Sequence, residues 1–248
     1  MILGNRDPLE ILRELDGYYE CPKGPGGERL GPLVGYAGRY DGPDGQKLQF
    51  VGDVYANFAK AERRGEVLGH FARILWGHPR LPGNNFCGAP EGGKALAVAL
   101  ATISGGQYIF PEKKITTLVT ETSREVSKLV FGRHEPAPGE KWWLVEDVCN
   151  NFSTTKALVA LVESFGAEVV GVVCFLNRSL SVDDEFEIAP GRKIPVVAIV
   201  RKPIDEWRQD DSAVADDVAR GNVAWKPKAD WERLKTAMRN AGALSGGI

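Results

Sequence analysis

The sequence predicts an α/β fold, built on a mostly parallel β-sheet that helices cover on both faces. Apolar segments of strand length alternate with segments of helical periodicity along the middle of the chain. Two of the expected strands, 168–176 (EVVGVVCFL) and 194–200 (IPVVAIV), are nearly continuous in apolar, largely β-branched residues, which is typical of strands buried on both faces. The length of 248 residues is enough for one large α/β domain or two small ones.

The individual elements follow from local patterns. Asp7 and Pro8 are typical of a helix start and predict a short helix over 7–15, whereas Gly and Pro residues over 22–46 indicate turns. Apolar runs predict strands, and an apolar period near 3.6 residues predicts helices. The remaining expectations are strands at 47–58, 107–110 and 142–146, helices at 62–77 and 154–165, a strand–turn–helix unit over 84–106, hairpin arms at 115–120 and 125–131, and tryptophan-anchored surface helices over 205–240.

Composition excludes several classes of protein and favours none strongly. The formal net charge is −2, so no overall charge attracts nucleic acid or an anionic membrane, and an anion site must be built locally. No apolar run reaches the length of a membrane span, and the first ten residues, MILGNRDPLE, lack the pattern of a signal peptide. The four cysteines form no CxxC pair, so we expect neither a zinc site nor a dithiol motif. Cys87, Cys149 and Cys174 lie in or beside apolar strands, so we expect them to be buried thiols in a reducing cytoplasm.

Two acids, Glu146 and Asp147, stand at the carboxyl end of the apolar strand 142–146, and a polar loop then leads into a helix. In parallel sheets, ligands bind at the carboxyl ends of the strands. The first backbone N–H groups of the helix are unpaired and form a seat for phosphate, whereas the carboxylates suit sugar hydroxyls. Together they predict a ribose 5-phosphate site. The alternative is purely structural, because Ser or Thr at a helix start is also the ordinary way to begin a helix.

The segment VEDVCNNFSTTK, residues 145–156, resembles the phosphoribosyl pyrophosphate (PRPP) signature of type I phosphoribosyltransferases. The order of the surrounding elements most resembles orotate phosphoribosyltransferase, from about Lys47 to about Arg239. The matching segments are KLQFVGDVYANFAKAERRGEVLGHFARIL for the N-terminal strand and helix, FCGAPEGGKALAVALA for the Gly-rich first loop, YIFPEKK for the strand with active-site lysines, and FLNRS for the strand end that carries a base-binding arginine.

The resemblance implies roles for particular residues. Glu146, Asp147 and Lys113 would be the catalytic residues, with the two acids on the ribose hydroxyls. Lys113, with Lys114, would contact the pyrophosphate, to which Mg²⁺ binds. Arg178 would contact the base, which in the family is orotate; a surface arginine is the alternative reading. The 5′-phosphate loop would consist of Asn150, Asn151, Ser153, Thr154 and Thr155.

Residues 111–139 would form the family's mobile hairpin hood, which often reaches the active site of a second subunit in a homodimer. A cationic hood suits a polyanionic substrate, although a solvated charged hairpin is the alternative. Its basic residues are Lys113, Lys114, Arg124, Lys128, Arg133 and His134. On this basis the chain divides into an N-terminal segment with hood-associated elements (1–80), a PRPP-binding α/β core (81–204) and a helical tail (205–248), with the chain ends forming a small subdomain.

Two residues depart from the family pattern. Glu91 stands where the family's first loop has lysine, so it places a negative charge near the pyrophosphate unless a metal or Lys94 compensates. Phe152 lies near a position that is normally glycine, and we expect Asn150 and Asn151 to adopt the unusual backbone angles instead.

Three functions therefore remain open at the level of the sequence. The first is an orotate-type phosphoribosyltransferase of pyrimidine nucleotide synthesis, which transfers ribose 5-phosphate from PRPP to a base. The second is a PRPP- or nucleotide-binding regulatory protein that has lost catalysis, and the departures at Glu91 and Phe152 support it. The third is a dinucleotide-dependent enzyme, which is weaker because GAPEGGKALA lacks the GxGxxG pattern.

Overall fold

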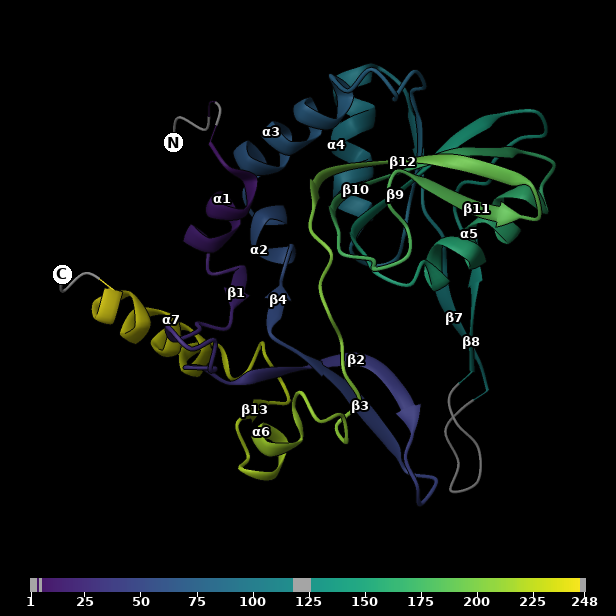
Figure 1. Ribbon diagram of the computed structural model, residues 1–248. Helices are drawn as coiled ribbons and strands as arrows, with labels where there is room; N and C mark the ends of the chain where they lie inside the picture. Colours follow the sequence, from purple (N-terminus) through teal and green to yellow (C-terminus); the bar gives the residue numbers. More distant parts are fainter. Residues whose placement is uncertain (1–3, 5, 118–125, 246–248) are drawn as a thin grey trace. The chain divides into compact units, whose positions relative to one another are not determined.

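The computed structural model describes residues 4, 6–117 and 126–245 (Figure 1). Its contacts divide the chain into two compact units. The core unit is Ala61–Pro203, together with the first residues up to Pro8. The terminal unit joins Leu9–Lys60 to Ile204–Ile248. The terminal unit thus contains residues from both ends of the chain, and a short helix, α2 (Ala59–Glu62), crosses the boundary between the units.

A six-stranded sheet forms the centre of the core unit, in the order β11-β12-β10-β9-β5-β6. The adjacent pairs are parallel, except that the edge strand β11 runs antiparallel to β12. The prediction of a mostly parallel sheet is therefore confirmed. The strands are β5 (Asn85–Gly88), β6 (Gln107–Ile109), β9 (Lys141–Cys149), β10 (Glu168–Asn177), β11 (Glu185–Ala189) and β12 (Arg192–Arg201).

Helices α4 (Lys94–Ser104) and α5 (Ser153–Glu163) connect neighbouring parallel strands in opposite directions along this sheet. The chain moves outward from β5 through α4 to β6, whereas it moves the other way from β9 through α5 to β10. Because such crossovers are right-handed, the two helices cover opposite faces of the sheet. A third helix, α3 (Gly65–Trp76), packs against α4 and β12.

The core of this unit is apolar, as the Val- and Leu-rich strands predict. Trp142, Leu144, Val172 and Cys174 from the strands are fully or almost fully buried in one cluster with Leu158 from α5. Cys87, Cys149 and Cys174 are buried and free, in agreement with the expectation for these three thiols, and Cys21 of the terminal unit is buried and free as well.

Strands β7 (Glu112–Thr117) and β8 (Val126–Val130) pair as an antiparallel hairpin within the core unit. The sequence predicts arms at 115–120 and 125–131, so the first arm begins three residues earlier than expected. Residues 118–125, and with them Arg124, lie outside the described part of the chain.

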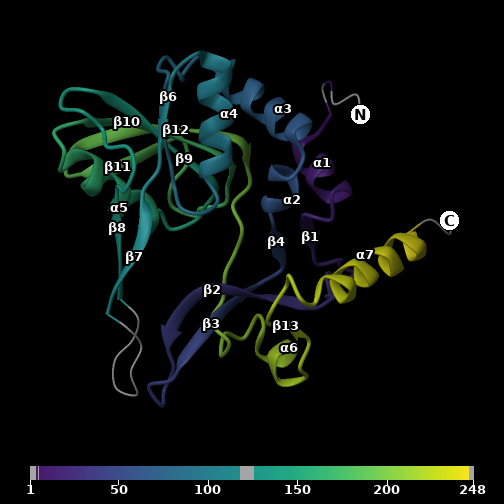
Figure 2. The ribbon, with the colours of Figure 1, turned by 180° about the vertical axis from the view of Figure 1, so that it is seen from behind.

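The terminal unit contains a three-stranded sheet, β13-β2-β3, and a two-stranded sheet, β1-β4 (Figure 2). The expectation of turns over 22–46 is wrong for β2, a nine-residue strand within that range. Its glycines, Gly35 and Gly38, are residues that indicate turns in a sequence but here lie within the strand. Trp231 is buried and Trp207 pairs with Val51, but Trp225 is exposed. The elements are α1 (Pro8–Glu14), β1 (Tyr18–Glu20), β2 (Leu33–Asp41), β3 (Lys47–Gly52), β4 (Val54–Ala56), α6 (Ala215–Ala219), β13 (Val223–Ala224) and α7 (Trp231–Ser245).

None of the helices in the described ranges combines the length and apolar character that crossing a membrane requires. The cytoplasmic location stays a prediction.

Candidate active site at the carboxyl ends of strands β5 and β9

The strand order of the central sheet reverses between β5 and β9, because the crossover after β5 leads toward one edge of the sheet and the crossover after β9 leads toward the other. A crevice opens outside the carboxyl ends of two such strands, because their connections leave toward opposite faces. The loop that follows β5 packs closely on β9 there. The Ala89 N–H donates to the Val145 carbonyl oxygen at 2.8 Å, and the backbone at Gly92 lies directly against the Asp147 carboxylate. The fold thus brings two loops, more than fifty residues apart in the sequence, to one place.

The acid pair lies within strand β9 and not after it, which corrects the predicted strand end at 146. The strand continues to Cys149 because β10 continues beside it, with Val148 opposite Leu176 and Cys149 opposite Asn177. Successive residues of a strand point to opposite faces. Glu146 accordingly lines a cavity beside helix α5, whereas the Asp147 carboxylate lies at Gly92. The two acids therefore approach the crevice from different sides.

The cavity beside Glu146 has a volume of about 160 Å³ and includes the start of helix α5 in its walls. The Ser153 N–H donates to Asn151 Oδ1 at 3.0 Å, so the Asn151 side chain shapes the turn into the helix. The structure brings the predicted phosphate-loop residues together with the first of the two acids. The lining consists of Glu146, Val148 and residues 149–155, which include Asn150, Asn151, Ser153, Thr154 and Thr155.

Phe152 itself takes the left-handed backbone conformation at the start of α5, with φ 57° and ψ 19°. The expectation that Asn150 and Asn151 would adopt these angles is wrong, since neither has a positive φ. The Phe152 ring is 3% exposed and stacks on Phe186, with 4.6 Å between ring centroids. This packing offsets a backbone cost of about 1–2 kcal/mol for a non-glycine residue. The bulky side chain is therefore packed in the core of this unit, although Phe152 also belongs to the lining of the cavity.

Glu146 has a strongly altered acidity. Burial, and after it the neighbouring Asp147 carboxylate, raise its pKa to about 8, although a backbone hydrogen bond and the Lys113 ammonium oppose the increase. A carboxyl group with such a pKa is largely protonated at neutral pH, so it can donate as well as accept a hydrogen bond. Perturbed acidity of this kind is common at functional sites.

Only one of the two predicted hood lysines faces the acid. Lys113 lies close enough to Glu146 to act on its pKa. Lys114 is the next residue of β7 and so points to the other face, where it is directly opposite Lys128. Both lysines are exposed, as are Arg133 and His134 at the end of the hairpin.

The negative charge of Glu91 is compensated by Lys94, one of the two possibilities that the sequence leaves open. Its carboxylate forms an ion pair with the Lys94 ammonium, with 2.9 Å between Oε2 and Nζ. The Lys94 ammonium also lies over the Phe110 ring, 5.1 Å from the centroid. The Glu91 side chain is 77% exposed, so this pair contributes at most about 1 kcal/mol to stability.

Arg178 is buried and is not an exposed surface arginine, and its contact with the base stays a prediction. It follows β10 directly and is 8% exposed. Its backbone N–H donates to the Cys149 carbonyl oxygen at 2.9 Å, which places Arg178 beside the end of β9. Cys149 also lines the cavity, but a hydrogen bond with Cys174 and complete burial raise its pKa, so its thiol stays neutral and is a poor nucleophile.

Gly92 and Gly93 lie in the Gly-rich loop after β5, but they were not among the predicted site residues. A Cβ at Gly92 would lie 2.3 Å from Asp147 Oδ1, and one at Gly93 would lie 1.9 Å from the Val145 carbonyl oxygen. Both positions therefore require glycine for close approach to β9. The paired glycines of APEGGK are the signal that could have identified them.

A dedicated metal site is absent from the described residues, where no three His, Cys, Asp or Glu side chains are grouped to hold an ion. Glu146 and Asp147 offer oxygen ligands of the type that Mg²⁺ prefers, but Mg²⁺ usually binds through one or two carboxylates together with substrate phosphates. The residues present therefore fit a metal that arrives with its substrate.

Comparisons with known proteins extend these observations, although no family model matches the chain. A segment of 74 residues is 38% identical to adenine phosphoribosyltransferase from Ruminiclostridium cellulolyticum, covering 27% of this chain and 43% of that protein. A segment of 124 residues is 27% identical to orotate phosphoribosyltransferase from Caldanaerobacter subterraneus subsp. tengcongensis, covering 50% of this chain and 56% of that protein. These curated relatives are phosphoribosyltransferases. The resemblance to that family, expected from the signature, is confirmed.

Solved phosphoribosyltransferases are also similar to the chain. Orotate phosphoribosyltransferase from Aeropyrum pernix is 15% identical with a TM-score of 0.47, covering 77% of this chain and 92% of that one. Adenine phosphoribosyltransferase from Trypanosoma brucei is 16% identical with a TM-score of 0.47, covering 80% and 82%. The chain spans about half the length of the curated relatives it matches, 43% and 56%.

Proposed function

We propose that the protein is a phosphoribosyltransferase, which transfers ribose 5-phosphate from PRPP to a nitrogenous base and releases pyrophosphate. The observation that carries this proposal is the cavity at the end of β9, where Glu146 and the start of α5 line the same space of about 160 Å³. The carboxyl group suits ribose hydroxyls, and the N–H groups of the helix start suit a 5′-phosphate. Those are the two recognition elements that ribose 5-phosphate requires.

In this proposal, Glu146 and Asp147 hold the ribose hydroxyls from two sides of the crevice. Lys113 supplies positive charge at the pyrophosphate, since it already acts electrostatically on Glu146. Mg²⁺ bound to the pyrophosphate would neutralise part of the leaving group's charge. The chain itself contributes positioning and charge stabilisation, so no nucleophilic side chain is needed.

The identity of the base is the finer part of the proposal, and we infer an orotate-type acceptor. Arg178 supports this inference, because a cation that is 8% exposed beside the crevice suits a planar carboxylate such as that of orotate. Adenine, which carries no carboxylate, is the competing acceptor, since one curated relative is an adenine phosphoribosyltransferase. As the resemblance implies, the proposal also includes a homodimer, which analytical ultracentrifugation would test.

Calorimetric titration of PRPP with Mg²⁺ tests the site first, with wild type, Asp147→Asn and the control Asp44→Asn, which lies on an exposed turn of the terminal unit. Losing a charge-assisted hydrogen bond should weaken binding about 10- to 100-fold in Asp147→Asn only. No binding to the wild type would refute the PRPP site.

Pyrophosphate release with orotate, uracil, adenine and hypoxanthine then tests catalysis and the base. Release with orotate alone is the expected result, and release with adenine alone would overturn the orotate assignment. The second candidate function is a regulatory protein that binds PRPP without catalysis, which the exposed carboxylate of Glu91 in the loop after β5 favours. Tight binding of PRPP without pyrophosphate release for any base would select that candidate.

A further inference from the structure

Trp225 is an exposed tryptophan with a fixed position in the terminal unit. It is 37% exposed, although the two preceding residues, Val223 and Ala224, are buried in the strand β13. The Gly35 backbone lies against one part of its ring, since a Cβ at Gly35 would be 3.0 Å from Trp225 Cε3. A large aromatic surface is thus held in place and still open to solvent.

This ring lines a cavity of about 430 Å³, which is within the usual range for small-molecule sites of about 300–1,000 Å³. Tyr55 and Gly35 form part of the same cavity, and the Tyr55 ring lies 6.5 Å from the buried Trp231 ring. All of these residues belong to the terminal unit, and none of them lines the cavity beside Glu146.

Two lysines give the cavity a positive charge. Lys226 and Lys228 both line it and are exposed, and no acidic residue is among the lining residues of the described chain. Neither ammonium forms an ion pair within the part of the chain that the structure describes. Two unpaired cations beside an open aromatic ring attract an anion that carries a flat ring system.

The turn that carries the lysines is well fixed. The Ala229 and Asp230 N–H groups both donate to the Lys226 carbonyl oxygen, at 2.8 and 2.9 Å. Asp230 is the acid nearest along this turn, and its Oδ2 accepts a hydrogen bond from the Lys226 N–H at 3.3 Å. The turn therefore presents both ammonium groups from a defined backbone.

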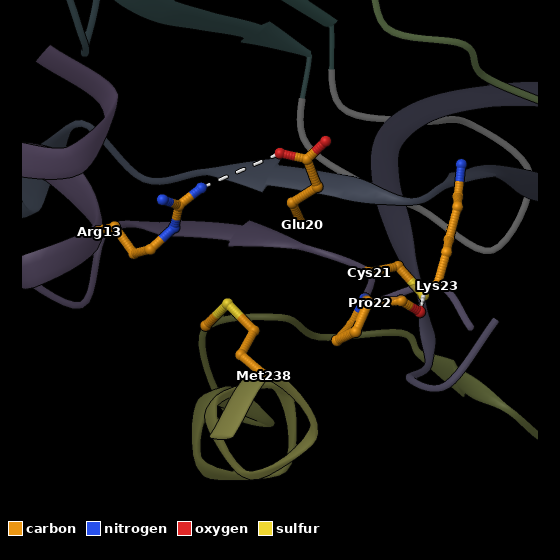
Figure 3. A pocket seen from close by; sticks show the side chains of 6 residues that line it. All are labelled: Arg13, Glu20, Cys21, Pro22, Lys23 and Met238. Atoms are coloured by element: carbon orange, nitrogen blue, oxygen red, sulfur yellow. Dashed lines mark hydrogen bonds and ion pairs between the residues drawn. The ribbon is translucent and has the colours of Figure 1, made fainter. Parts of the chain in front are cut away.

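A second hollow of the terminal unit differs in charge (Figure 3). It has a volume of about 460 Å³, and its lining includes Arg13, Glu20 and Lys23. Arg13 lies 4.0 Å from the Glu20 carboxylate, and Lys23 pairs with Asp53 at 3.1 Å. Its cations are already neutralised by carboxylates, whereas those beside Trp225 are not.

We propose that the cavity at Trp225 binds a nucleoside monophosphate, with the base stacked on the Trp225 ring and the phosphate held by Lys226 and Lys228. A phosphate monoester carries a charge of about −1.5 to −2 at pH 7, which matches two lysines. Single-stranded nucleic acid has the same chemistry, but it requires a basic groove that follows several phosphates. Two lysines in a chain of net charge −2 favour the free nucleotide. This proposal does not depend on the activity proposed above.

The test is an NMR titration that follows the indole N–H signals, with the Trp225 signal assigned by its loss in Trp225→Phe. Addition of AMP or UMP should shift this signal saturably. Calorimetry in an Asp147→Asn background compares proteins with and without Trp225→Ala. This substitution should raise the dissociation constant of the nucleotide about 5- to 150-fold, because a base stack is lost. No shift of the Trp225 signal at millimolar nucleotide would overturn the proposal.

Charge is tested with Lys226→Glu/Lys228→Glu against the matched control Arg63→Glu/Arg64→Glu, which reverses two exposed charges in the core unit. Only the first double variant should lose the shift, and circular dichroism would show that both are folded. Equal loss in both variants would mean general electrostatic attraction and would refute the site. Tighter binding of a short oligothymidylate than of UMP would overturn the assignment to a free nucleotide.

Discussion

Glu146→Gln should remove a pH dependence of folding stability that the wild type carries. In the folded protein the pKa of Glu146 is raised from 4.5 to about 8, chiefly by burial. Between these values the folded state binds more protons than the unfolded state, so the free energy of unfolding falls as pH rises. The stabilisation is complete below about pH 4.5 and is lost as pH passes through 8. Glutamine is neutral throughout and should not show this loss.

The size of the effect follows from the pKa change. The rise of the pKa from 4.5 to about 8 corresponds to at most about 5 kcal/mol, and we expect about 2–5 kcal/mol because the Glu146 side chain keeps some exposure to solvent. Urea unfolding between pH 5 and 9 would measure it for wild type, Glu146→Gln and the exposed control Glu135→Gln. The difference between wild type and Glu146→Gln should grow with pH, while Glu135→Gln follows the wild type. Parallel curves for all three proteins, or an NMR titration that gives Glu146 a pKa near 4.5, would refute the reasoning.

Two further substitutions test the local structure of the site. Phe152→Ala should destabilise the fold by about 3–5 kcal/mol in urea unfolding, because the stack on Phe186 is lost. Phe152→Gly should be about 1 kcal/mol more stable than Phe152→Ala, because glycine relieves the strain of the positive φ. Equal stability of the two variants would contradict this backbone argument. Gly92→Ala should weaken PRPP binding, measured by calorimetry, at least about tenfold, because the added Cβ would lie 2.3 Å from the Asp147 carboxylate. The control Gly65→Ala, whose Cβ would meet no atom within 4 Å, should bind PRPP as the wild type does. Unchanged binding in Gly92→Ala would show that this loop is not part of the PRPP site.

The parallel sheet and the acid pair could be predicted because both depend on short, continuous patterns. Buried strands are apolar runs, and the two acids interrupt one of them. The extent of β9 could not be predicted, because Val148 and Cys149 stay in the strand only through their partners Leu176 and Asn177 on β10. Tertiary pairing decides such boundaries more than local propensity does.

The role of Phe152 was also beyond local reasoning. Intrinsic propensity favours a positive φ at Asn more than at Phe. Phe152 nevertheless adopts the positive φ, because Phe186, far along the chain, supplies a stacking partner for its ring. The choice between Lys113 and Lys114 likewise depends on the strand register of the hairpin, which composition does not reveal.

The terminal unit has a consequence for the order of folding during synthesis. Its strand β2 pairs with β13 through Leu33 and Val34 opposite Val223 and Ala224, residues that the ribosome adds about 190 positions apart. Closing so long a loop is slow, whereas the contacts within each βαβ unit of the core are more local. The core unit can therefore complete its sheet while the first half of the terminal unit still waits for its last strand and helix. A nascent chain stalled before residue 223 would keep Tyr19, Val34 and Tyr36 without the residues that bury them, and it would be a substrate for chaperones.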